Sequence, residues 1–262
     1  MAARRHWLRV ARARSVRTAS PWRARSLWAC LAGSCLLVAP RAHACGVSAS
    51  GVSSCSLAEH DEAVRPRWAV GASGLYTVTR LRFSGGLYAD QVRYATLGSF
   101  AYLPTPKLVL QAGAGAAFGG SLRVPGETEY RFSAGPTLAL GADYRAFDDG
   151  RYFLMLTSSL SFSAARTHRN AEPSESSQAY DLRLGAELGL TLAELQRPYL
   201  LARAFGGPVF WTYHDAAVSG TDTHHYQLGL GAAVRFSKTL SLFGEAVPLG
   251  ERALSAGIGL AL

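Results

Sequence analysis

The chain has 262 residues, of which 48% are hydrophobic, and a formal net charge of +9. Residues 1–44 hold nine arginines and no acidic residue, so the remainder carries 18 basic and 18 acidic side chains. A chain that is basic throughout would favour a nucleic-acid partner, whereas this balanced remainder predicts none.

The first 44 residues have the parts of a secretory signal peptide. A basic region that extends to Arg25 precedes an apolar run at 27–39, and Ala42-His43-Ala44 matches an A-x-A cleavage site. The apolar run is shorter than the ~20 residues that a spanning helix needs. We therefore expect residues 1–44 to be a signal peptide that is removed on export, so that the mature chain begins at Cys45.

Residues 45–66 are small, polar and rich in turn formers, and they predict a periplasmic N-terminal tail. After residue 44 the chain has two cysteines, Cys45 and Cys55, and an exported chain enters an oxidising compartment in which a disulfide can form between them. A lipid on Cys45 is the alternative, although lipoprotein signals usually have leucine where this chain has Ala42.

In the rest of the chain, apolar and polar residues alternate with a period of two. From Tyr180 to Leu192 every even position is apolar or aromatic and every odd position is polar or glycine. This period is that of a β-strand, because a helix would scatter the leucines around its circumference. Ten segments follow the pattern, at about 67–79, 87–102, 107–119, 130–145, 151–165, 180–192, 199–213, 224–236, 239–247 and 253–262. We expect local irregularities at Pro136 and at 206–208, where proline and glycines interrupt the pattern.

The connections between these segments alternate in length. The connections after the second, fourth, sixth and eighth segments are short, whereas those after the third, fifth and seventh are longer and polar, at 120–129, 166–179 and 214–223. An even strand number with short turns at one end and longer loops at the other is typical of a membrane barrel. The predicted fold of residues 67–262 is all-β, an antiparallel up-and-down transmembrane β-barrel of about ten strands, with eight to twelve as the range.

The strands of a soluble β-sandwich or barrel also alternate between apolar and polar residues. The prediction of a membrane barrel therefore depends on which residue types make up the two rows. Aromatic residues flank the apolar rows, as with Tyr226 and Phe236, and the polar rows consist mostly of glycine, serine and threonine. The outer face of a soluble barrel should carry many lysines, and the chain has only Lys107 and Lys238. These features favour a barrel in a bilayer over a secreted soluble β-protein.

Together, the signal peptide, ten amphipathic segments, flanking aromatics and apolar final strand resemble the small outer-membrane β-barrel proteins of Gram-negative bacteria. The resemblance implies a location in the outer membrane, contact with outer-membrane lipid and lipopolysaccharide, and insertion by the barrel-assembly machinery. One difference is that such barrels usually end in phenylalanine, whereas this chain ends in Leu262. The resemblance implies an architecture and no particular activity.

The polar rows contain charged residues that are predicted to face the lumen. We expect an interior network of ion pairs, with Glu187 roughly opposite Arg203, because an unpaired charge inside the barrel would be costly. The alternative is the lining of a solute-selective channel. The predicted network consists of Arg131, Asp143, Arg145, Asp181, Arg183, Glu187, Arg203 and Arg235.

The seventh connection and its flanks hold the side chains that would suit a metal site or a water-activating pair, namely His214, Asp215, Asp222, His224 and His225. Adjacent histidines in a strand face opposite ways, and no partner appears at matching depth on a neighbouring segment. We therefore predict no enzyme activity, no metal and no cofactor. The predicted function is a structural or surface-interaction barrel, with a narrow channel for small solutes or an outer-membrane hydrolase that uses the loops as alternatives.

Overall fold

The computed structural model describes residues 44–47, 53–56, 68–169, 174–192, 195–237 and 239–262. The predicted signal peptide lies outside these residues except for Ala44, so its structure is not described. Within the described residues, no helix combines the length and apolar character needed to cross a membrane.

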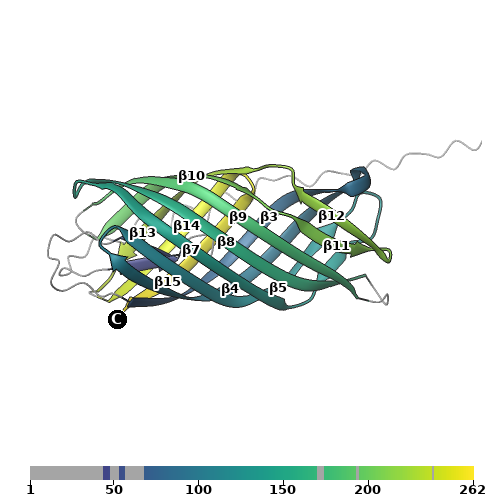
Figure 1. Cartoon of the computed structure of the whole chain (residues 1–262), viewed down its shortest axis with the longest axis horizontal. Helices are drawn as coiled ribbons and strands as arrows, with labels where there is room; N and C mark the ends of the chain where they lie inside the picture. Colours follow the sequence, from purple (N-terminus) through teal and green to yellow (C-terminus); the bar gives the residue numbers. More distant parts are fainter. Residues whose placement is uncertain (1–43, 48–52, 57–67, 170–173, 193–194, 238) are drawn as a thin grey trace, which may run out of the picture. The chain divides into compact units, whose positions relative to one another are not determined.

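The described residues form a closed antiparallel barrel of ten strands, which confirms the predicted fold (Figure 1). Each strand pairs with the next, and β15 returns to β3, with Ile258 opposite Ala72 and Leu260 opposite Val70. The backbone amide of Leu262 also donates to the carbonyl of Trp68, at 2.9 Å. The ring consists of β3 (Trp68–Phe83), β4 (Tyr88–Thr105), β5 (Leu108–Arg123), β7 (Gly135–Asp148), β8 (Tyr152–His168), β9 (Glu175–Leu190), β10 (Gln196–Gly206), β13 (Tyr226–Arg235), β14 (Leu240–Gly250) and β15 (Arg252–Ala261).

The barrel narrows at the end opposite Leu262. There β14 and β15 end early at a tight turn, in which Gly250 has a φ of 82°. Any side chain at Gly250 would collide with the carbonyl of Tyr226, so both the conformation and the space require glycine. Above this turn, three short strands complete a second ring: β6 (Tyr130–Phe132), β11 (Val209–Tyr213) and β12 (Ala216–Asp222).

This second ring contains eight strands of the described chain, and we call it the collar. β12 pairs with β3, with Gly220 opposite Phe83 and Asp222 opposite Leu81, and β11 pairs with β9. β6 joins β5 to β8, so the order around the collar is β3, β4, β5, β6, β8, β9, β11 and β12. Because eight-stranded barrels are just wide enough to be filled by side chains, the collar favours a filled interior.

Two of the predicted long loops are partly strand, which corrects the sequence-based assignment. β8 continues to His168 and β9 begins at Glu175, so most of 166–179 belongs to the barrel wall. Residues 214–223 contain β12, which forms a hairpin with β11. The break between β10 and β11 at 206–208 lies where the sequence predicted an irregularity.

The fourth predicted strand contains a change of phase. It divides into β6 and β7, and Ser133 and Ala134 between them belong to neither. Tyr130 and Phe132 are therefore buried inside the collar, whereas Arg131 is exposed on the outside. The prediction that Arg131 belongs to the lumen network is wrong. It assumed one continuous alternation from residue 130 to residue 145, but the break at Ser133 and Ala134 reverses which residues of β6 face inward.

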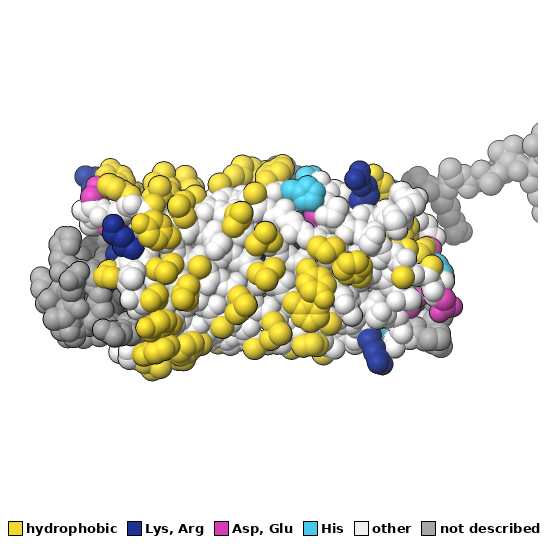
Figure 2. Space-filling model, in the orientation of Figure 1, with side chains coloured by type: hydrophobic (Ala, Val, Ile, Leu, Met, Phe, Trp, Pro, Cys, Tyr) yellow, Lys and Arg dark blue, Asp and Glu magenta, His cyan; other side chains and the backbone are white. Residues whose placement is uncertain are grey.

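The outer surface of the barrel is apolar over most of its height (Figure 2). Leucines such as Leu140, Leu184 and Leu200 are 55–65% exposed on this surface. Two rings of aromatic side chains bound the apolar surface, one with Trp68 stacked on Tyr102 at 4.2 Å and the other with Tyr76 beside Tyr94 at 5.2 Å. Eight residues of β3 separate the two rings, which is roughly 20 Å along the normal of a tilted strand. An apolar outer surface with aromatic side chains at both of its edges is typical of the lipid-facing wall of a membrane β-barrel.

The predicted tail contains a short hairpin. β1 (Ala44–Val47) pairs with β2 (Ser53–Ser56), and the register places Cys45 directly opposite Cys55. Directly opposed residues in an antiparallel pair are close enough for a disulfide to be considered. The disulfide remains a prediction.

Candidate functional site

The polar interior of the barrel is the candidate functional site, and Arg203 on β10 lies at its centre. Nη2 of Arg203 lies 2.7 Å from Oε1 of Glu187 on β9. The same guanidinium lies 2.9 Å and 3.1 Å from the two carboxylate oxygens of Glu245 on β14. The Tyr199 hydroxyl donates to Glu245 at 2.9 Å. The predicted pairing of Glu187 with Arg203 is present, and all four side chains are buried.

Glycines on the neighbouring strands make room for this network. Gly185 pairs with Arg203, and the Arg203 side chain occupies the position that a Cβ at Gly185 would take. Gly231 pairs with Tyr199, whose ring covers it in the same way. The side chains of Arg203 and Tyr199 therefore lie flat against the barrel wall. They fill the space that Gly185 and Gly231 leave open.

A second cluster lies nearer the collar. Arg183 on β9 forms ion pairs with Asp181 and with Glu251, the latter at 3.0 Å. Glu251 lies in the tight turn between β14 and β15 and also accepts from Nε2 of Gln227, at 2.8 Å. Because that turn ends below the rim of the collar, it brings a buried carboxylate into the interior.

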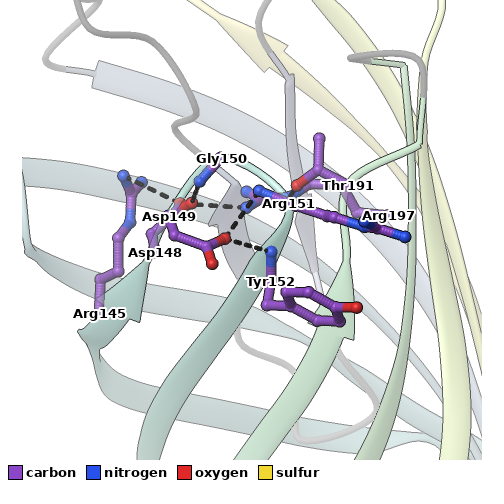
Figure 3. Close-up of polar contacts among 8 residues, drawn as sticks. All are labelled: Arg145, Asp148, Asp149, Gly150, Arg151, Tyr152, Thr191 and Arg197. Atoms are coloured by element: carbon purple, nitrogen blue, oxygen red, sulfur yellow. Dashed lines mark hydrogen bonds and ion pairs between the residues drawn. The ribbon is translucent and has the colours of Figure 1, made fainter.

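A third cluster lies at the end of the barrel where β7 ends and β8 begins, and Figure 3 shows its polar contacts. Asp148 accepts from Arg197 at 3.2 Å and lies 3.5 Å from Arg145. Arg197 also donates to Thr191 at 3.0 Å, and its guanidinium stands 4.2 Å from the centre of the Phe153 ring. Asp149 accepts from the backbone amides of Arg151 and Tyr152 and so closes the turn. Asp148 therefore connects this turn to Arg197 on β10.

An apolar plug fills the collar. Trp211, Tyr130 and Leu122 are among the largest fully buried side chains in the described protein. The indole of Trp211 donates to Thr167 at 3.0 Å, so its polar atom is satisfied inside the plug. The plug consists of Leu81, Phe83, Ala89, Leu122, Val124, Tyr130, Phe132, Val209 and Trp211.

A polar cap lies over the plug, centred on Glu127 in the connection between β5 and β6. Glu127 accepts from the hydroxyls of Tyr130 and Tyr213 and pairs with Arg169 at 3.2 Å. Nε2 of His214 lies 3.5 Å from the same carboxylate. Burial raises the pKa of Glu127, but the hydrogen bonds from Tyr213, Tyr130 and His214 outweigh it and hold the pKa below its ordinary value.

Most other members of the predicted network also lie on inward rows. Asp143 is buried and accepts from Nε2 of Gln111 at 2.5 Å. Arg235, on the inward row of β13, lies near the cluster of Arg197. The sequence reasoning missed Glu251, which it placed in a turn. Ala253 and Ser255 of β15 face the interior, and Glu251 stands two residues before Ala253. The same alternation, continued backwards, would have predicted that Glu251 also faces the interior.

The histidines and aspartates of the seventh connection do not converge. His214 and Asp215 form the turn between β11 and β12, whereas Asp222 faces the interior and accepts from Thr79. His224 contacts Thr223, and His225 packs near Phe205. In the part of the chain that the structure describes, no group of three His, Cys, Asp or Glu side chains is arranged to hold a metal ion.

No family model and no curated protein matches the chain. Among solved structures, the outer membrane protease OmpT from Escherichia coli superposes with a TM-score of 0.51 at 10% identity, over 78% of this chain and 99% of that one. The fold is that of an outer-membrane β-barrel. The translocator domain of the autotransporter NalP from Neisseria meningitidis has a TM-score of 0.45 at 13% identity, over 77% and 90% of the two chains. At these identities the likeness concerns the fold alone.

Proposed function

We propose that this chain is an outer-membrane barrel with a closed lumen, which serves as a structural element and presents its collar and cap for surface interactions. It reaches the outer membrane by the signal peptide at 1–44, and it is neither an open pore nor an enzyme. The observation that carries this proposal is the filling of the interior at successive levels, from the cluster at Arg197 through the network at Arg203 to the apolar plug.

Physical chemistry supports this assignment. The ion pairs of Arg183, Arg197 and Arg203 hold these side chains in one arrangement, because separating any pair would leave a buried charge without a partner. The plug is apolar and packed, so it offers neither water nor polar groups to a hydrophilic solute. Ten strands stand well below the 16–18 strands of barrels that enclose a water-filled channel.

The test is conductance of the purified, folded protein in planar bilayers, with sugar uptake into liposomes as a second measurement. We expect no steady conductance and no uptake of a disaccharide, whereas a general porin in the same membranes provides the positive control. The fold of the sample is checked by its migration in gels, because a closed barrel in detergent should migrate differently before and after boiling. Large, reproducible conductance would replace this proposal with the channel.

Location is tested separately. Membrane fractionation should recover the protein with the outer membrane, and mass spectrometry of the extracted chain should give a mature protein that begins at Cys45. Recovery in the soluble fraction, or a retained leader, would contradict the location or the export step.

A further inference from the structure

Beneath the apolar plug lies a polar cavity of about 130 Å³. Leu81 and Val209 of the plug form part of its lining, so the plug is its roof. Arg93, Asp181, Arg183 and Glu251 line its sides. A volume equal to roughly four water molecules in the liquid suits a ligand of only a few heavy atoms.

Arg93 on β4 is a partly buried cation that lacks an anionic partner within the described part of the protein. Nη1 donates to Ser163 at 2.8 Å, and the guanidinium lies 5.1 Å from the centre of the Phe132 ring. Nη2 is buried and has no hydrogen-bond partner. A guanidinium keeps its proton, and a buried charge without a counter-charge is costly. The arrangement therefore fits an anionic group placed at Nη2.

A free acceptor lies on the adjoining strand. Asp181 on β9 uses one carboxylate oxygen for Arg183, and its other oxygen, Oδ1, is buried without a partner. Ser161 pairs with Asp181 and Ser163 pairs with Ala179 across β8 and β9. Ser163, which accepts from Arg93, therefore lies two residues along β8 from the partner of Asp181, and Arg93 and Asp181 line the same cavity. One small molecule that carries an anion and a hydrogen-bond donor can satisfy both free atoms.

The charged residues that line the cavity indicate which hydrogen-bond donor the ligand carries. Asp181, Glu251 and Asp222 contribute three carboxylates to the lining, and Arg183 is the cation that stands among them. A ligand with only an anionic group would meet Arg93 but would also face this acidic wall. A ligand with an added ammonium group would place a positive charge beside the carboxylates.

We propose that this cavity is a binding site for a small zwitterion of the α-amino-acid class, whose carboxylate is held by Arg93 and whose ammonium is held by Asp181. The β11–β12 hairpin provides the access route, because three residue pairs join it to β9 and three join it to β3. Short ladders of this kind open locally at lower free energy than the long strands of the barrel.

The test is calorimetric titration of the folded, full barrel in detergent with three probes. Glycine carries both charges, acetate only the anion, and methylammonium only the cation. We expect glycine to bind and the other two to bind at least about tenfold more weakly, because each lacks one charge-assisted hydrogen bond. No binding of glycine, as expected for a cavity that holds water only, or equal binding of glycine and acetate, would overturn the proposal.

Two variants and a matched control assign the residues. Arg93→Gln and Asp181→Asn should each weaken glycine binding by roughly tenfold or more, whereas Arg82→Gln, which changes an exposed arginine of β3, should leave binding unchanged. Glycine binding that survives Arg93→Gln would overturn the proposal. If a variant does not fold, as judged by gel migration before and after boiling, the three probes on the wild-type protein decide the question.

Discussion

Arg203 is the residue on which the interior charges depend, because one guanidinium lies between two buried carboxylates. Arg203→Ala would leave Glu187 and Glu245 facing each other without a cation. We expect a loss of about 3–5 kcal/mol in the free energy of unfolding. Glu187→Ala should cost less, because Arg203 keeps Glu245. Urea unfolding of the protein in detergent measures both.

The double variant Glu187→Ala/Arg203→Ala should lose less stability than the two single losses predict together, because Arg203→Ala leaves Glu187 as a buried carboxylate without a cation and Glu187→Ala removes that carboxylate. Arg82→Ala on the outer face is the control and should stay within about 0.5 kcal/mol of the wild type. Strictly additive losses would show that the two side chains do not interact.

Glu127 makes the cap sensitive to acid. Its pKa is lowered in the folded protein, so its contribution to stability is complete above the ordinary value of 4.5 and is lost as the pH falls through the lower folded value. The fluorescence of Trp211 in the plug should therefore change in this acidic range in the wild type, and Glu127→Gln should remove that step.

Glu129 provides the comparison for this experiment. Its pair with Arg123 is on the surface, so Glu129→Gln should leave the Trp211 signal unchanged. Identical pH profiles for the wild type and Glu127→Gln would contradict the role of Glu127 in the cap.

At the scale of elements, the β11–β12 hairpin has a turn that strains its residues. His214 and Asp215 have φ values of 47° and 61°, the left-handed conformation of a two-residue type I′ turn. Asp215→Gly should stabilise the collar by about 1 kcal/mol, and Asp215→Val should destabilise it, because a β-branched residue tolerates positive φ poorly. Hydrogen exchange of the β11 and β12 amides measures the difference, and equal protection in the two variants would refute it.

The same hairpin shows why part of the fold could not be predicted. The alternation of β9 is clear from Tyr180 onward, because one face meets the apolar exterior and the other meets the interior. Ala216–Asp222 of β12 lies in the collar, where the outer face has no apolar requirement, so its small and polar residues show no such contrast. The three residues of β6 are too few to establish a period, and the phase change at Ser133 placed Arg131 on the wrong face.

At the scale of the whole molecule, ten strands could be counted because each long strand crosses the apolar belt once. The narrowing to eight strands could not be predicted, because it depends on pairing between β12 and β3, which are distant in the sequence. The interior was predicted in part: neighbouring strands bring Glu187 to Arg203. Nη2 of Arg93 and Oδ1 of Asp181 have no hydrogen-bond partner. This could not be predicted, because it depends on how side chains from strands all around the barrel are placed, and residue spacing within one strand does not determine that.

The register at the closing seam gives the most direct test of the whole barrel. β15 pairs with β3, with Ile258 opposite Ala72 and Leu260 opposite Val70. In a chain with Cys45→Ser and Cys55→Ser, the pair Ala72→Cys/Ile258→Cys should form a disulfide in the folded protein, because directly opposed Cβ atoms lie about 4.5–5.5 Å apart and small adjustments bring them to bonding distance. The pair Ala72→Cys/Leu260→Cys occupies the same face two residues out of register, about 7–8 Å away, and should cross-link far less. Non-reducing gels of boiled samples report the product, since the bond joins the two ends of the barrel into one large loop. Preferential cross-linking of the out-of-register pair would mean that the ring closes differently, and with it the interior arrangement of Arg203 and Arg93 would need revision.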